Sequence, residues 1–186
     1  MAKFILGKKL GMTTIYGDQK EALNVTLLEC ESKVSLLRTA EKDEYEAVQI
    51  EMQKTKKRVV KREFKVVGST LAVGDSIGVE IFAIGDVVRV SGITKAKGFQ
   101  GVVKRYRFKG GKATHGHKHD LRAPGSIGAT TPQHVMKGRR MAGRMGGERS
   151  TSENLKVVFI DKVKKLIGVK GSVPGIPGTV IEIYNN

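Results

Sequence analysis

The 186-residue sequence lacks tryptophan, has one cysteine and four prolines, and contains no long apolar run. The single cysteine, Cys30, excludes an internal disulfide and is typical of a protein from a reducing compartment. No stretch approaches the roughly 18 consecutive apolar residues of a membrane-spanning helix, so we expect no integral membrane protein. The first apolar run, Phe4-Ile5-Leu6, is too short for a secretory signal, and we therefore predict a cytoplasmic protein.

Acidic residues are also scarce, with 18 Asp and Glu against 34 Lys and Arg, which gives a net charge of +16. The charge is concentrated in two segments. Residues 95–149 contain 14 basic and two acidic residues, and residues 54–65 contain seven basic residues and one acidic residue. The other 119 residues carry a net charge of −2. The sequence therefore predicts a nearly neutral body with two basic segments that favour a polyanionic partner.

The longer basic segment has an unusual composition. It holds 11 of the 23 glycines and all four histidines, and it has few large aliphatic side chains. Such a glycine density disfavours regular helices and strands, and the segment cannot bury enough apolar area to fold alone. A flexible linker is one interpretation, but a linker has no need of Phe99, Tyr106 and Phe108. A segment that becomes ordered on a polyanion accounts for both its composition and its aromatic residues.

The rest of the sequence favours short β-strands separated by turn signals. Residues 77–81 alternate apolar and polar side chains, as in a half-buried strand. The best candidate for a helix is 54–62, which is helix-compatible but has no apolar face. The other expected strands are residues 4–6, 13–16, 23–30, 34–37, 47–52, 87–90, 157–160, 166–169 and 180–184.

This pattern predicts an all-β protein with a β-barrel, assembled from two parts of the chain. Residues 1–91 and 156–186 supply the barrel. Residues 92–155 form a long, irregular, basic extension inserted between barrel strands. Because both ends of the extension are held at the barrel, the chain must leave and return.

Enzyme and metal sites find little support in the sequence. Three histidines at alternate positions (His115, His117 and His119) could hold a transition metal, but lysine and arginine surround them. The sequence around Gly111-Lys112 lacks the first glycine and the Ser or Thr of a phosphate-binding loop. We therefore predict no enzyme, no cofactor and no small-molecule substrate, and we keep a histidine-cluster metalloenzyme as an alternative.

Nucleic-acid binding accounts for more features of the sequence than an enzyme or metal site does. Lysine and arginine neutralise phosphates and release counterions, and glycine lets the backbone approach phosphate and ribose closely. Arginine, histidine and the few aromatic residues can stack on unpaired bases. The irregular distribution of glycines favours a folded RNA over a uniform duplex.

Several motifs, in order along the chain, resemble the L3 family of large-subunit ribosomal proteins. Residues 92–105 (GITKAKGFQGVVKR) resemble the start of the family's extension, and residues 122–128 (RAPGSIG) and 137–146 (KGRRMAGRMG) continue it. Residues 7–13 (GKKLGMT) and 169–175 (VKGSVPG) resemble the terminal motifs. The resemblance covers the chain from end to end.

This resemblance implies a translation-protein-type β-barrel whose extension enters the large-subunit ribosomal RNA and reaches toward the peptidyl transferase centre. It also implies early binding during assembly, contacts with neighbouring ribosomal proteins, and no catalytic activity. The tip of the extension is expected within residues 124–144. The basic residues and the motifs together predict RNA contacts at Lys8, Lys9, Lys95, Lys97, Phe99, Lys104, Arg105, His115, Arg122, Gly125, Ser126, Lys137, Arg139, Arg140 and Arg144.

The sequence departs from the family pattern in three places. Family members usually carry a longer insert where only residues 53–63 stand here, so we carry over no partner contact through that insert. Residues 117–122 are irregular, and Ala129 replaces the glutamine that is methylated in some relatives. A transient RNA-binding assembly or translation factor is the alternative to a permanent ribosomal component.

Overall fold

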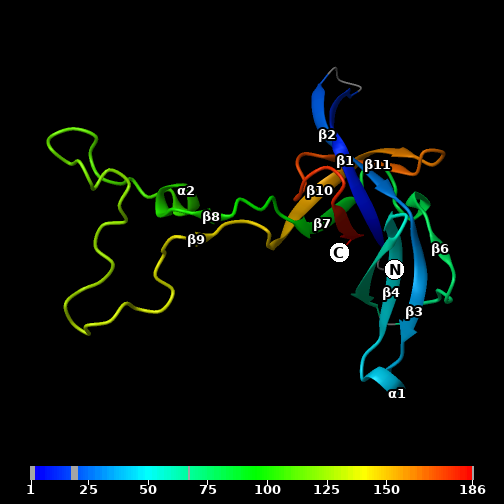
Figure 1. Ribbon diagram of the computed structural model, residues 1–186. Coiled ribbons are helices and arrows are strands. Elements are labelled where there is room, and N and C mark those ends of the chain that lie inside the picture. The colour runs from blue at the N-terminus through cyan, green and yellow to red at the C-terminus, as the bar shows by residue number, and fades with distance from the viewer. Residues whose placement is uncertain (1–2, 18–20, 67, 186) are drawn as a thin grey trace. The chain divides into compact units, whose positions relative to one another are not determined.

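The computed structural model describes residues 3–17, 21–66 and 68–185 (Figure 1). The chain divides into two compact units. We call the first unit, made of the chain up to residue 94 and from residue 149 onward, the body. The second, residues 95–148, we call the inserted unit. No helix among the described residues is long and apolar enough to cross a membrane.

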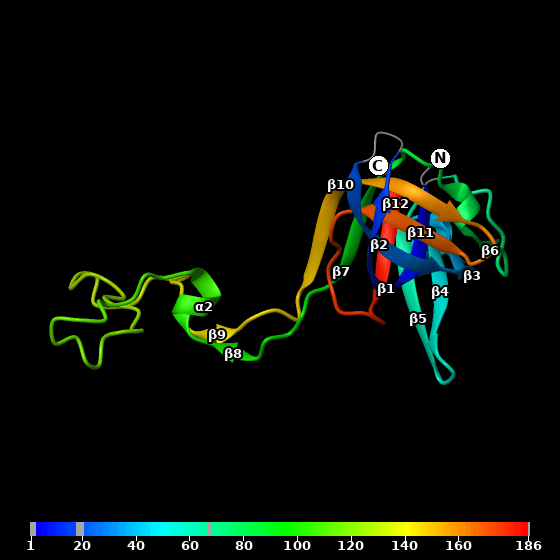
Figure 2. The same ribbon diagram turned by 90° about the horizontal axis from the view of Figure 1, so that it is seen from above.

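Six antiparallel strands of the body form a closed barrel (Figure 2). Their order around the barrel is β1, β12, β7, β10, β11 and β2. The all-β prediction is therefore confirmed. The strands are β1 (Phe4–Tyr16), β2 (Ala22–Cys30), β7 (Val87–Ile93), β10 (Arg149–Asp161), β11 (Leu166–Lys170) and β12 (Val180–Asn185).

A second antiparallel sheet of four strands, in the order β5, β4, β3 and β6, completes the body. A single-turn helix, α1 (Ala40–Asp43), joins β3 to β4 along the chain, and a 3-10 turn (Val79–Ile81) follows β6. The strands are β3 (Ser32–Arg38), β4 (Ala47–Thr55), β5 (Arg58–Lys65) and β6 (Ser76–Ile77).

One apolar core serves both the barrel and the four-stranded sheet. On β4 the alternating residues Val48, Ile50 and Met52 are buried, as the period-2 pattern of a half-buried strand requires. Phe64 of β5 stacks on Phe4 of β1, with ring centroids 4.9 Å apart. Burying an aliphatic or aromatic side chain of this size contributes about 1.5–3 kcal/mol, so the shared core holds the sheet against the barrel.

The helix-compatible interpretation of residues 54–62 is wrong. Residues 58–62 belong to β5, which pairs with β4 in a register that includes Met52 opposite Val60 and Thr55 opposite Arg58. β-Branched residues favour strands, and a helix here would have had no apolar face to bury. Pairing with β4 therefore overrides the weak local helix propensity.

The strand expected over residues 77–81 is also largely wrong. Only Ser76 and Ile77 pair with β3, and residues 79–81 form the 3-10 turn. Gly78 precedes the turn in an extended conformation, and Val79 is buried. Ile77 and Val79 thus enter the core as alternation requires, but no neighbouring strand continues the hydrogen-bonded ladder.

Cys30 lies at the end of β2 with no exposed surface. Burial raises the pKa of its thiol, so the reactive thiolate is disfavoured. We expect the native protein not to react with a chromogenic disulfide reagent at pH 8, and the urea-unfolded protein to react with one equivalent. Rapid labelling of the native protein would contradict this placement.

The inserted unit lies in sequence between two strands that are neighbours in the barrel. β7 and β10 pair up to Ile93 opposite Arg149. The guanidinium of Arg149 binds the carboxylate of Glu182 on β12, which also accepts a hydrogen bond from Arg62 at 2.9 Å. Glu182 raises the pKa of Arg149. An ion-pair cluster therefore lies where the chain re-enters the barrel at β10.

Candidate nucleic-acid interface

The inserted unit begins and ends as a paired double strand. β8 (Phe99–Gln100) is antiparallel to β9 (Gly143–Arg144), with Phe99 opposite Arg144. The amide of Lys97 donates to the carbonyl of Met145 at 2.9 Å, and the Met145 amide donates to the Gly98 carbonyl at 2.9 Å. The outgoing segment (residues 97–100) and the returning segment (residues 143–145) are therefore hydrogen-bonded to each other.

Beyond this pairing, Arg105 on the short helix α2 (Val102–Tyr106) connects the outgoing segment to the returning segment. Its Nη1 donates to the carbonyl of Met141 at 2.7 Å. The same Nη1 would lie 2.8 Å from a Cβ placed on Gly143. Glycine at position 143 therefore leaves the room that this guanidinium occupies.

An aromatic and cationic cluster surrounds Tyr106 at the end of α2. The guanidinium of Arg105 lies 4.9 Å from the centroid of the Tyr106 ring, and that of Arg140 lies 5.6 Å from it. The ring of Phe108 is tilted against Tyr106 at 6.3 Å. Both guanidiniums lie within the distance at which a cation is attracted to the π electrons of an aromatic ring.

Two adjacent glycines let the chain approach itself closely further along. A Cβ on Gly110 would lie 2.5 Å from the carbonyl oxygen of Leu121, and one on Gly111 would lie 2.6 Å from that of Asp120. Gly110 also has φ of +74°, which side-chain-bearing residues rarely adopt. These glycines bring together the ends of the loop that carries His115.

Arg139 joins two further parts of the unit. Its Nη2 donates to the carbonyl of Ser126 at 2.5 Å, and the Ser126 hydroxyl donates to the carbonyl of Gly128 at 2.9 Å. The hydrogen bond from Arg139 thus connects the motif at residues 137–146 to the motif at residues 122–128.

Most of the predicted RNA contacts in this unit are exposed. Phe99 has 76% of its surface exposed, which is unusual for a phenylalanine that only supports a fold. Arg105 alone among them is half-buried. The exposed ones are Lys95, Lys97, Phe99, Lys104, His115, Arg122, Gly125, Ser126, Lys137, Arg139, Arg140 and Arg144.

The inserted unit is strongly cationic. Its 13 lysines and arginines stand against only Asp120 and Glu148, so a charge of +11 remains uncompensated within it. Val102 is its only buried apolar side chain among the described residues. The unit therefore combines strong attraction for an anionic partner with almost no core of its own.

The two predicted contacts outside the inserted unit, Lys8 and Lys9 on β1, differ from each other. Lys8 is half-buried, whereas only 8% of Lys9 is exposed. The ammonium of Lys9 donates to the carbonyls of Val173 at 2.8 Å and Gly175 at 3.0 Å. It therefore binds the loop before β12 instead of facing solvent.

The histidines do not assemble a metal site. Within the described residues no group of three or more His, Cys, Asp or Glu side chains is arranged to hold a metal ion. His115 has φ of +61°, and His115, His117 and His119 are all exposed. The metalloenzyme alternative gains no support from this geometry.

The family model described as ribosomal protein L3 matches residues 38–172, which include β4, β5 and β6 of the second sheet, the whole inserted unit and the barrel strands β7, β10 and β11. The chain belongs to the ribosomal protein L3 family. The resemblance inferred from the five sequence motifs is thereby confirmed.

Bacterial L3 relatives extend the match to nearly the whole chain. A protein of Herpetosiphon aurantiacus named large ribosomal subunit protein uL3 is 44% identical, covering 98% of this chain and 96% of the relative. The uL3 protein of Chlorobium phaeobacteroides is 40% identical over 98% of each chain. That of Shouchella clausii is 38% identical over 100% of this chain and 98% of its own length.

Sequence reasoning missed two features of the charged surfaces. It identified Tyr106 only as one of several aromatic residues, and the cations on its ring come from positions 105 and 140, which no local pattern connects. It also misjudged residues 54–58, because a helix was expected where the chain forms the end of a hairpin. A two-residue turn of lysines carries no composition signal for a hairpin.

Proposed function

We propose that this protein is a structural constituent of the large ribosomal subunit in the cytoplasm, without catalytic activity of its own. In this role the inserted unit binds large-subunit ribosomal RNA, and neighbouring ribosomal proteins contact the body. The names of the relatives and the family membership support the assignment to the large subunit. The observation that carries RNA binding is the inserted unit's uncompensated charge of +11 with a single buried apolar side chain.

The proposed mechanism is phosphate neutralisation by exposed lysines and arginines, combined with base stacking by Phe99 and by the cluster around Tyr106. RNA binding supplies the free energy that offsets the ordering of a unit with almost no core. We include in the proposed interface all the predicted contacts except Lys9, because its ammonium already binds two carbonyls of the body.

The family resemblance supports two finer parts of the proposal. The chain joins the subunit early in assembly, and residues 124–144 extend toward the peptidyl transferase centre. Depletion of the protein should then cause an early large-subunit precursor to accumulate. Probing of assembled subunits with a cleavage reagent tethered at residue 136 should cut RNA near that centre.

Co-sedimentation tests whether the protein is a permanent component. We expect about one copy per large subunit to remain after a wash in 0.5–1 M salt. Release by that wash would instead indicate a transient factor. A subunit free of the protein at every stage would contradict both roles.

Replacing two neighbouring arginines tests the phosphate contacts. We expect R139A/R140A to weaken binding to a large-subunit RNA transcript and to lower the slope of log Kobs against log salt by about 1–2 units. Filter binding at several salt concentrations measures this slope. An unchanged slope would show that neither guanidinium contacts phosphate.

A further inference from the structure

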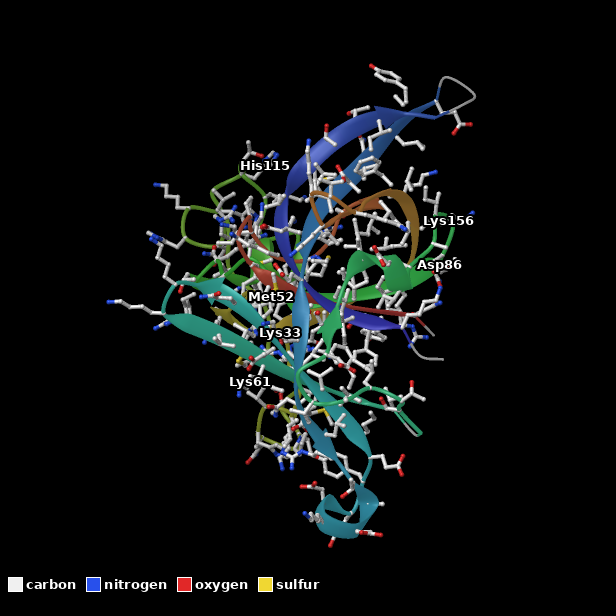
Figure 3. All side chains as sticks on the ribbon, turned by 90° about the vertical axis from the view of Figure 1, so that its right-hand side faces the viewer. Lys33, Met52, Lys61, Asp86, His115 and Lys156 are labelled. Carbon is white, nitrogen blue, oxygen red and sulfur yellow. The ribbon has the colours of Figure 1, made fainter. Side chains whose placement is uncertain are left out.

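The second basic segment of the sequence forms the end of the β4–β5 hairpin. We call residues 54–58 the hairpin tip. Four of its five side chains are cationic and exposed, namely Lys54, Lys56, Lys57 and Arg58. In Figure 2 the hairpin reaches beyond the other strands of the body, and in Figure 3 side chains ending in nitrogen project from this region near the labelled Lys61.

The backbone of the hairpin places three of these cations in a turn or in a strand irregularity. Thr55 pairs with Arg58, which leaves Lys56 and Lys57 as the two turn residues. The register shifts between Gln53 and Thr55, so Lys54 lies in an irregularity of the strand. Bulges of this kind re-aim a side chain and increase the local twist. Lys54, Lys56 and Lys57 therefore lie outside the regular strand ladder, where a β-strand face does not fix their positions.

The fold itself does not require this composition. Two-residue hairpin turns favour Asn-Gly or similar pairs, and neither Lys56 nor Lys57 has the positive φ that such turns use. Four positive charges within five residues also repel one another.

Two other cations of the same hairpin have acidic partners, whereas the four cations of the tip have none in the described part of the chain. Lys61 lies 3.5 Å from the carboxylate of Glu51, and Arg62 binds Glu182. Among the residues that the structure describes, none of the four cations in the tip has an acidic partner. The concentration of charge at the tip therefore calls for a partner outside the chain.

We propose that the hairpin tip is a second RNA-binding surface, which contacts the phosphate backbone of helical RNA independently of the inserted unit. This inference rests on the proposed function, since it assumes an RNA environment around the body. The tip has cations but no aromatic side chain, so it can neutralise phosphates but cannot stack on bases. The inserted unit differs in this respect, because Phe99 and Tyr106 offer ring faces.

The same composition argues against a protein partner at the tip. Protein interfaces are enriched in aromatic residues, methionine and arginine around an apolar centre, and they are depleted in lysine. The tip has three lysines and no apolar side chain. Phosphates spaced along an RNA groove match flexible lysine side chains better than a packed protein surface does.

The test compares two pairs of lysines in the full-length protein. K56Q/K57Q removes two charges from the tip, and K162Q/K164Q removes two from the turn between β10 and β11, where both lysines are also exposed. Binding of each variant to an in vitro transcript of large-subunit RNA is measured between 100 and 400 mM salt. We expect K56Q/K57Q to lower the salt slope by about 1.5 units and K162Q/K164Q to change it by less than about 0.5.

A second arm separates phosphate contacts from base contacts. A 20-base-pair RNA duplex of unrelated sequence should compete for the tip, so that in its excess the difference between wild type and K56Q/K57Q disappears. Equal slopes for K56Q/K57Q and wild type without competitor would overturn the inference, as would equal losses in the two variants. Persistence of the difference in excess duplex would also overturn it.

The outcomes also distinguish this inference from the proposed function. Failure of the wild type to bind the transcript would overturn both. Loss of slope in R139A/R140A with none in K56Q/K57Q would overturn only the role of the tip. Far-UV circular dichroism and melting temperatures of both glutamine variants should match the wild type, because the exchanged side chains contribute nothing to the core.

Discussion

Replacing residues 94–148 with Asn-Gly should leave a folded barrel that has lost most of its affinity for large-subunit RNA. Ile93 pairs with Arg149, so a two-residue turn between them continues the antiparallel β7–β10 ladder as a tight hairpin. The variant loses 13 lysines and arginines but only one buried apolar side chain, Val102. Its core and the Arg149–Glu182 contact remain intact.

We expect the deletion to weaken binding to an RNA transcript by about 100-fold or more and to lower the salt slope by about 4–6 units, as the loss of half a dozen phosphate contacts would. Circular dichroism should retain the β signal and show a cooperative thermal transition. An unfolded product would mean that the inserted unit stabilises the body. Undiminished affinity would place the main RNA-binding surface on the body.

The control for this deletion is a charge-only variant of the full-length chain. Changing Lys95, Lys97, Lys104 and Arg144 to glutamine keeps the backbone of the inserted unit but removes four charges near its base. We expect an intermediate loss of slope, about 3 units. A loss equal to that of the deletion would assign nearly all of the binding to the base of the unit.

Lys9→Met should lower the free energy of unfolding by about 2–3 kcal/mol. The thioether side chain keeps much of the apolar stem, but it leaves the carbonyls of Val173 and Gly175 without their ammonium donor. Hydrogen bonds to a charged group contribute about 1.5–3 kcal/mol, and a buried acceptor without a partner is costly. The measurement is equilibrium unfolding in urea, followed by circular dichroism.

Lys8→Met is the matched control for this variant, because Lys8 precedes Lys9 on the same strand but is half-buried. We expect it to change stability by less than about 0.5 kcal/mol, as surface substitutions usually do. RNA binding should respond in the opposite way, with a measurable effect for Lys8→Met and little direct effect for Lys9→Met at temperatures where both are folded. Equal destabilisation by both substitutions would contradict the role of the Lys9 ammonium.

The strands were accessible to sequence reasoning where alternation or apolar runs carried the signal. Val48, Ile50 and Met52 alternate on β4, and residues 157–160 form an apolar run in β10. Residues 77–81 show the limit of this signal. The alternation correctly predicted that Ile77 and Val79 are buried. It could not show that β3 begins at Ser32, opposite Ile77, and so offers no partner to residues 78–81.

The candidate interface was predictable as a set of residues but not as an arrangement. Charge and glycine content marked the inserted unit, since both are properties of composition. The bond from Arg139 to the Ser126 carbonyl and the two guanidiniums around Tyr106 join positions that are far apart in the chain. Which of these residues contact each other is decided by the tertiary structure.

The sequence by itself determined that the chain is all-β, that one long basic segment interrupts it, and that its motifs are those of the L3 family. These properties follow from periodicity, composition and residue order, which are local or additive along the chain. Only the tertiary structure decided which lysines are buried, which are exposed and what each of them contacts. Lys9 is buried because its ammonium binds two carbonyls that lie more than 160 positions away in the sequence. Lys56 and Lys57 lie at the exposed end of a hairpin because β4 pairs with β5. Whether a lysine meets solvent, carbonyl or phosphate depends on partners that are distant in the sequence.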